Sequence, residues 1–279
     1  MTSWIRATRK KPEEEKEKSY LFQTEEGETA AQFTAYLYAQ MFAKNNGRIL
    51  NVYDKSSLIS ANFELIRSTF ADISGVETAD SIVPTAIGVG IKHQVRLLPY
   101  LSGVGLDAIR SAAATVLDWK PSMLQEIEGA IKTSRIPTEY DFCVHLRGQP
   151  TNLMTSSKPV SVTTYVQAAN DAVKALKLGR PPVIFVMSES GALFEDFKKR
   201  VDVTWKLHNL GALGIFDTRR PSPRTRMLQY VQYVTELYLA QKCPLIISSL
   251  GSPTGRFLYL TCDSVAQFKG LDTNMMTFY

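Results

Sequence analysis

The chain has 279 residues, of which 44% are hydrophobic and 21% charged, a balance typical of a soluble globular protein. This length suits two lobes of ordinary size or one large α/β domain. The longest apolar runs, such as 183–187, are far too short to span a bilayer. The net charge of +5 permits an anionic ligand but does not require nucleic acid.

The N-terminal stretch and the cysteines indicate the compartment. Residues 1–18 are rich in charge and have little to bury, so we expect a disordered charged tail without the apolar segment of a signal peptide. Cys143, Cys243 and Cys262 are odd in number and lack the spacing of a metal site. We therefore expect buried free thiols in a reducing compartment, and a cytoplasmic protein.

The fold is predicted to begin with one β-α-β unit. A short strand at 21–23 precedes a helix at 30–44, which ends at Asn45-Asn46-Gly47 before a strand at 48–53. A helix of this length suits a right-handed crossover between parallel strands. Residues 60–135 are expected to be mostly helix and loop, and no GxGxxG spacing follows a strand there. The first lobe is predicted to span 19–138.

The second lobe, 139–279, alternates between strand and helix patterns. Strands are predicted at 141–147, 183–187, 214–216 and 244–248, and helices at 163–178, 193–200, 227–241 and 255–262. This alternation predicts an α/β fold with a parallel, doubly wound sheet. Ligands of such sheets bind outside the carboxyl ends of the strands.

Arg147 follows the strand at 141–147, where Phe142, Val144 and Leu146 alternate with Cys143 and His145. The guanidinium offers a fixed fork of donors that suits a phosphate. The alternative is a structural ion pair at the strand end.

Two further strand ends carry small, polar or cationic residues. Ser188, Glu189 and Ser190 follow the second strand, and the last strand is followed by Ser249, Ser252, Thr254 and Arg256. A helix that starts near Thr254 adds backbone N–H groups and the positive end of its dipole, which favour an anion. The hydroxyls could instead only cap the helix. Three such loops on one edge indicate a nucleotide site.

These segments resemble the fucosyltransferase-type glycosyltransferases, a superfamily of alpha-1,2-, alpha-1,6- and protein O-fucosyltransferases. His145-Leu146-Arg147 is similar to the His-x-Arg that ends a strand in that family, and Ser188-Glu189-Ser190 loosely matches its acidic turn. The most specific match runs from Glu236 through Cys243 and an apolar strand to Ser252, Thr254 and Arg256. The resemblance is carried mainly by residues 140–262.

The resemblance implies two Rossmann-like lobes in the GT-B arrangement, with the nucleotide-sugar site in the cleft between them. The first lobe would face the acceptor, a glycan or a protein, and the second would bind the GDP-sugar, GDP-fucose. The donor-binding set would be His145, Arg147, Ser188, Glu189, Glu236, Ser249, Ser252, Thr254 and Arg256. Within it Arg147 would hold the diphosphate, and Glu236 would orient the ribose or the base. No cofactor or metal is expected, because cationic side chains and helix ends would neutralise the leaving diphosphate.

The sequence departs from the family pattern at the donor motifs. Gly148 and Pro150 stand where the family often has a second arginine and an aspartate, and the acidic turn is Ser-Glu-Ser. Three alternatives therefore stay open: a transferase of another deoxysugar such as rhamnose, a non-catalytic nucleotide- or glycan-binding member, and a nucleic-acid or surface-binding protein. The basic loop 218–226 motivates the third, but it lacks the interleaved aromatic residues of a single-strand platform.

The general base is expected in the first lobe. Glu28 is the candidate and Glu26 the second choice, because both follow the first strand at its carboxyl end. Either carboxylate could instead only interact with the dipole of the following helix.

Overall fold

The structure, a computed structural model, divides into two compact units, one within residues 1–120 and the other within 121–278. The expected lobe boundary at 138/139 falls after helix α6 (Pro121–Ser134), whereas the division of the structure falls before it. The expected tail at 1–18 lies outside the described residues. The structure describes residues 19–24, 29–45, 49–54, 69–70, 76–78, 88–89, 105–147, 160–188, 190–211, 223–262 and 266–272.

The first unit contains a parallel four-stranded sheet in the order β3-β2-β1-β4. Its strands are β1 (Ser19–Thr24), β2 (Ile49–Asp54), β3 (Val76–Thr78) and β4 (Gly88–Val89). Helix α2 (Thr29–Asn45) links β1 to its parallel neighbour β2, so the predicted β-α-β unit is confirmed.

Helix α2 is the core of the first unit. It packs against β1, β2 and helix α5 (Leu106–Val116), and its described apolar side chains are buried on every side of the helix. Phe33 of α2 meets Phe70 edge-on with ring centroids 4.8 Å apart, and Phe70 in turn contacts Trp119 at 5.4 Å. Such aromatic pairs each add about 0.5–1.5 kcal/mol beyond the area they bury.

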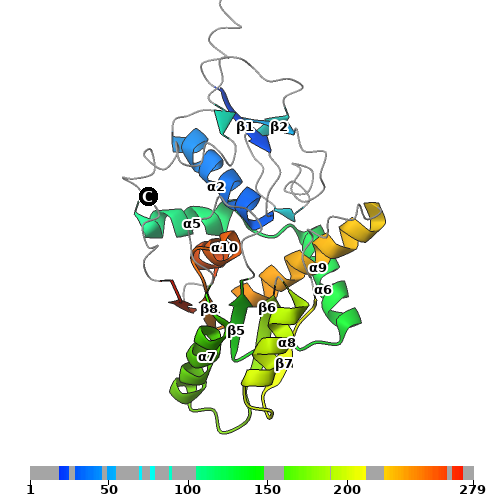
Figure 1. Cartoon of the computed structure of the whole chain (residues 1–279). Coiled ribbons are helices and arrows are strands. Elements are labelled where there is room, and N and C mark those ends of the chain that lie inside the picture. The colour runs from blue at the N-terminus through cyan, green and yellow to red at the C-terminus, as the bar shows by residue number, and fades with distance from the viewer. Residues whose placement is uncertain are drawn as a thin grey trace, which may run out of the picture. The chain divides into compact units, whose positions relative to one another are not determined.

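The second unit is a five-stranded sheet in the order β7-β6-β5-β8-β9, and all of its strands are parallel (Figure 1). The strands are β5 (Phe142–Leu146), β6 (Val183–Ser188), β7 (Lys206–His208), β8 (Leu245–Ser248) and β9 (Gln267–Gly270). Besides α6, its helices are α7 (Val162–Leu176), α8 (Gly191–Arg200), α9 (Pro223–Gln241) and α10 (Pro253–Thr261). The predicted parallel sheet with alternating helices is confirmed.

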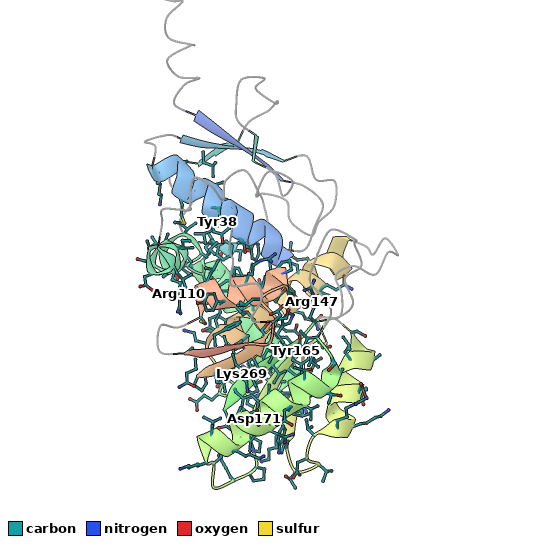
Figure 2. The ribbon with its side chains drawn as sticks, turned by 60° about the vertical axis from the view of Figure 1, so that its left-hand side comes forward. Tyr38, Arg110, Arg147, Tyr165, Asp171 and Lys269 are labelled. Atoms are coloured by element: carbon teal, nitrogen blue, oxygen red, sulfur yellow. The ribbon has the colours of Figure 1, made fainter. Side chains whose placement is uncertain are left out.

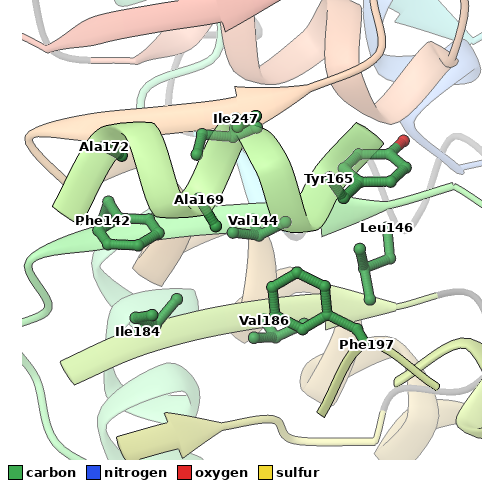
Figure 3. Packing of buried hydrophobic residues seen from close by; sticks show 11 residues of the cluster. Phe142, Val144, Leu146, Tyr165, Ala169, Ala172, Ile184, Val186, Phe197 and Ile247 are labelled. Atoms are coloured by element: carbon green, nitrogen blue, oxygen red, sulfur yellow. The ribbon is translucent and has the colours of Figure 1, made fainter. Parts of the chain in front are cut away.

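One face of this sheet packs against α7 and α8 (Figure 3). Alternate residues of β5 (Phe142, Val144 and Leu146) meet Tyr165 and a run of alanines on α7. Small residues on the helix let it approach the sheet closely. Full burial of each large apolar side chain contributes about 1.5–3 kcal/mol.

The other two residues of β5, Cys143 and His145, point to the opposite face of the sheet, since strand side chains alternate. Helix α9 covers this face against β6, and α6 and α10 pack on α9.

The three cysteines are free and buried, as predicted. Burial raises the pKa of the Cys143 thiol, and its neighbours Cys243 and Glu236 raise it further.

Ion pairs lie beside two parts of the second sheet, at the start of the neighbouring strands β5 and β6 and at the edge strand β9. Asp141, just before β5, accepts two hydrogen bonds of 2.8 Å from Arg180 and one of 2.7 Å from the Val183 N–H at the start of β6. Burial alone would raise the pKa of Asp141, but these hydrogen bonds and the charge of Arg180 outweigh it and lower the pKa. At the edge strand β9, the ammonium of Lys269 lies 3.4 Å from the carboxylate of Asp171 on α7 (Figure 2).

Two strands of the second sheet, β7 and β9, lie outside the predicted set. The strand predicted at 214–216 falls outside the described residues. Among the helices that the structure describes, none is both long enough and apolar enough to cross a membrane.

Candidate nucleotide-binding site

The topology of the second sheet selects one edge as the candidate site. From β5 the chain proceeds through β6 to β7 on one side, and then returns to pair β8 on the other side of β5. Strand order therefore reverses between β5 and β8. In open parallel sheets the ligand crevice lies at this switch point, outside the carboxyl ends of the strands. Arg147 follows β5, and residues 249–254 follow β8.

Arg147 is held at this edge by its own backbone. Its N–H donates to the hydroxyl of Tyr165 on α7 at 3.3 Å, and only 4% of the residue is exposed (Figure 2). A guanidinium that is almost fully buried must be hydrogen-bonded, because an uncompensated charge is costly away from water. At the other end of β5, Asp141 forms an ion pair with Arg180.

The His145 side chain contacts the neighbouring strand β8 within the sheet. Its Nδ1 lies 2.9 Å from the Oγ of Ser248, the residue opposite it on β8, and only 1% of His145 is exposed. This contact fixes the two strands on either side of the switch point relative to each other.

The loop after β8 is packed tightly under helix α10. A Cβ placed on Gly255 would come within 2.0 Å of the Ser249 carbonyl oxygen and 2.7 Å of the Ser248 Oγ. Only glycine therefore allows the first turn of α10 to lie on this loop. The Ser249 Oγ donates to Asp272 at 2.5 Å.

Ser252 is the N-cap residue of α10 and is fully buried. An N-cap serine ordinarily accepts a hydrogen bond from an N–H of the first turn, but this Oγ makes no such bond. Among the described residues, Ser252 Oγ and the Tyr140 hydroxyl are the buried side-chain atoms without a hydrogen-bond partner. The first intrahelical bond is Arg256 N–H to Ser252 O at 2.9 Å, so the earlier N–H groups of the helix point outward from its end.

Thr254 and Arg256 complete this end of α10. The Thr254 Oγ1 lies 3.1 Å from the hydroxyl of Tyr233 on α9, and the Arg256 guanidinium donates to the Leu250 carbonyl at 3.4 Å. The structure thus gathers His145, Arg147, Ser249, Ser252, Thr254 and Arg256 around β5, β8 and α10. Helix dipole, N–H groups and arginines together make this edge suited to an anion.

The other described residues of the predicted set, Ser188 and Glu236, make contacts of their own. Ser188 ends β6, and its hydroxyl donates to the Ser190 carbonyl at 2.7 Å within the turn. Glu236 lies on α9, is 2% exposed and is a neighbour of the Cys143 thiol. Glu28, Glu26 and Glu189 fall outside the described residues.

Four residues that contact the cluster were not in the predicted set: Tyr165, Tyr233, Ser248 and Asp272. Ser248 ends a predicted strand, so a search of strand ends would have found it, whereas Asp272 follows β9, a strand that was not predicted. The tyrosines come from helices far away in sequence, and no local pattern marks them. In the part of the chain that the structure describes, no group of three or more His, Cys, Asp or Glu could hold a metal ion.

A scan against protein-family models gives no match, and a search of curated proteins gives none. Solved structures are similar. NodZ alpha-1,6-fucosyltransferase co-crystallized with GDP has a TM-score of 0.56 at 13% identity, over 87% of this chain and 92% of that chain. Fucosyltransferase NodZ from Bradyrhizobium gives 0.57 and 12%, over 87% and 93%. POFUT1 in complex with GDP gives 0.55 and 11%, over 91% and 99%.

The chain has the fold of these fucosyltransferases. The resemblance expected from the sequence is therefore confirmed for the fold, as is its α/β class. Identity of 10–13% leaves the activity to be argued from the site itself.

Proposed function

We propose that this protein is an inverting glycosyltransferase that moves a sugar, L-fucose, from GDP-fucose to a hydroxyl of a glycan or protein acceptor. The observation that carries the proposal is the buried, unpartnered Ser252 Oγ at the N-terminus of α10. A buried hydroxyl without a partner costs about 1–3 kcal/mol, and a phosphate oxygen would supply the missing bond. The similar structures of NodZ and POFUT1 contain GDP, so a nucleoside diphosphate is the candidate ligand.

In this proposal the second unit binds the donor. The diphosphate meets Ser252 and the first turn of α10, and Thr254 is oriented by Tyr233. Arg147 stabilises the negative charge that grows on the leaving diphosphate, which is most valuable in a dry site. Glu236 is buried close behind the sheet, so its proposed contact with the ribose or base is the least direct of the set.

The chemical step is a single displacement. The acceptor oxygen forms a bond to the anomeric carbon as the bond from that carbon to the diphosphate breaks, and GDP leaves. The acceptor proton passes to a general base, for which Glu28 is proposed. Metal independence and a cytoplasmic location stay predictions.

A non-catalytic nucleotide-binding protein is the second candidate. It is favoured by the Ser188 hydroxyl, which is already engaged within its own turn, and by Gly148 and Pro150 in place of charged residues. Transfer or hydrolysis of GDP-fucose by the purified protein would exclude it.

Thermal unfolding with nucleotides tests the proposal. We expect GDP to raise Tm. At a hundredfold excess over Kd, bound GDP should raise the free energy of unfolding by about 2.7 kcal/mol. UDP should do so much less, and EDTA should leave the GDP effect in place. A UDP effect as large as that of GDP would remove the main support for a GDP-sugar donor.

Two serine variants make the assay specific for the site. Ser252→Ala should abolish most of the GDP shift without lowering the Tm of the ligand-free protein, since no hydrogen bond is lost and the cost of the unpartnered hydroxyl is removed. Ser161 is the matched control, because it is the N-cap of α7 and accepts from the Thr164 N–H at 3.1 Å. Ser161→Ala should lower stability by about 1 kcal/mol and keep the GDP shift. An undiminished GDP shift in Ser252→Ala would show that the phosphate binds elsewhere.

A further inference from the structure

Strand β9 brings a carboxylate to the candidate site. It pairs with β8 in parallel, with Ser248 opposite Gly270, and the Leu271 N–H donates to the Ser248 carbonyl at 3.0 Å. Parallel neighbours end at the same sheet edge, so Asp272 emerges beside the loop 249–252 that leads into α10.

The Asp272 carboxylate binds this loop at three points. Oδ1 accepts from the Leu250 N–H at 2.6 Å, and Oδ2 accepts from the Gly251 N–H at 2.8 Å and the Ser249 Oγ at 2.5 Å. Hydrogen bonds to an ionised acceptor are about twice as strong as neutral ones. The loop carbonyl of Leu250 in turn accepts from Arg256 at 3.4 Å.

Close packing leaves the loop little freedom. Gly255 of α10 touches the Ser249 carbonyl from one side, since any Cβ there would overlap it. Leu250, which is 2% exposed, packs on Gly270 of β9: a Cβ added to Gly270 would lie 3.3 Å from a methyl carbon of Leu250. The carboxylate therefore binds a loop that is already held between α10 and β9.

Two successive backbone N–H groups in a loop form a concavity that binds anions. Here the protein's own carboxylate occupies the N–H groups of Leu250 and Gly251. A phosphate at this edge is then left with the unpartnered Ser252 Oγ and the first turn of α10, and not with the loop.

We propose that Asp272 is a positioning residue for the donor: it fills the anion-binding amides of the loop and thereby fixes Ser252 at the start of α10. This inference rests on the proposed function for the identity of the ligand. The binding of the Asp272 carboxylate to the loop 249–251, called the clamp below, rests on the contacts alone.

The test combines GDP titration with hydrogen exchange on the full chain, for the wild type and for Asp272→Asn. In the wild type, the amides of Leu250 and Gly251 should be protected. In Asp272→Asn, exchange should accelerate in the peptide that covers 249–252, and GDP should bind about tenfold or more weakly. Asp171→Asn is the control, because it removes an exposed carboxylate beside β9 and should change neither measurement.

The outcomes test the clamp, the positioning role and the proposed function separately. Unprotected wild-type amides, or unchanged exchange in Asp272→Asn, overturn the clamp, and the wild-type measurement does so even if the variant fails to fold. Faster exchange with GDP bound as tightly as before, or more tightly, overturns the positioning role. A wild type that shows no GDP binding overturns the proposed function and with it the donor role, while exchange still decides the clamp.

Discussion

Arg147 combines almost complete burial with a place at the switch point. Its backbone is tied to Tyr165, and the alternation of β5 sends the neighbouring apolar side chains to the α7 face. A preorganised cation needs no reorganisation when charge develops on a leaving group, which is the condition under which electrostatic catalysis is effective, and this is the role proposed for Arg147. The side chain of Arg180, by contrast, is 56% exposed and pairs with Asp141, just before the start of the same strand.

We predict that Arg147→Ala lowers turnover by about a hundredfold or more, because the guanidinium acts mainly in the transition state. Arg147→Lys should rescue activity only in part, since a point charge cannot reproduce the fork of donors. Arg180→Ala should lower Tm with turnover at 25 °C unchanged. Initial rates of GDP-fucose turnover on folded protein measure all three, and wild-type turnover in Arg147→Ala would exclude the role.

Several site residues could be predicted from sequence because a local rule places them. Arg147 and Ser252 follow strands, and strand ends of a parallel sheet meet at one edge. The uses of His145 and Ser188 could not be predicted, since their partners depend on strand register and turn geometry. Asp272 acts through atoms more than 20 residues away in sequence.

At the scale of elements, α10 determines the shape of the site. It begins with Pro253 after the N-cap Ser252, and six of its residues are buried. Proline suits this position because the N–H it lacks would have no intrahelical partner. Gly255 then lets the helix rest on the Ser249 carbonyl.

Gly255→Ala should therefore destabilise the protein by about 1–3 kcal/mol, since a backbone carbonyl cannot move aside as a side chain can. GDP binding should weaken with it, because the start of α10 must shift. Gly129, inside α6, has nothing within 4 Å of an added Cβ. Gly129→Ala should stabilise by about 0.5–1 kcal/mol through helix propensity alone. Denaturant unfolding measures both, and equal effects of the two substitutions would contradict the close contact.

The edge strands mark where sequence patterns were insufficient. β7 is three residues long with Lys206 and His208 at its ends, and β9 places Lys269 beside Asp171. Short, polar strands carry little hydrophobic alternation, and their strand conformation depends on pairing with β6 and β8. The central strands β5, β6 and β8 are apolar runs and were predicted close to their observed bounds.

For the whole molecule, the parallel sheet of the second unit could be predicted from the alternation of elements. In the first unit only the β-α-β unit was predicted, because the short strands β3 and β4 lie within residues 60–135, which were expected to be mostly helix and loop. The division between the units could be predicted less directly. Helix α6 is amphipathic and packs on α9, so its contacts assign it to the second unit. Local sequence around Pro137 marks a loop but does not reveal which helix lies against α6. Because the donor is proposed to bind the second unit, acceptor activation is proposed for the first.

Glu28 provides the test of that assignment. We predict that Glu28→Gln lowers turnover by about a hundredfold or more, because proton transfer by a positioned base contributes that much. The affinity for GDP should stay the same, since the donor is proposed to bind the other unit. Glu26→Gln is the control and should retain activity. Parallel measurements of initial rate and GDP binding separate the two effects. If Glu28→Gln keeps full turnover, the carboxylate serves only the start of α2, and the remaining alternatives are Asp54 at the end of β2 as the base or a mechanism that needs no base.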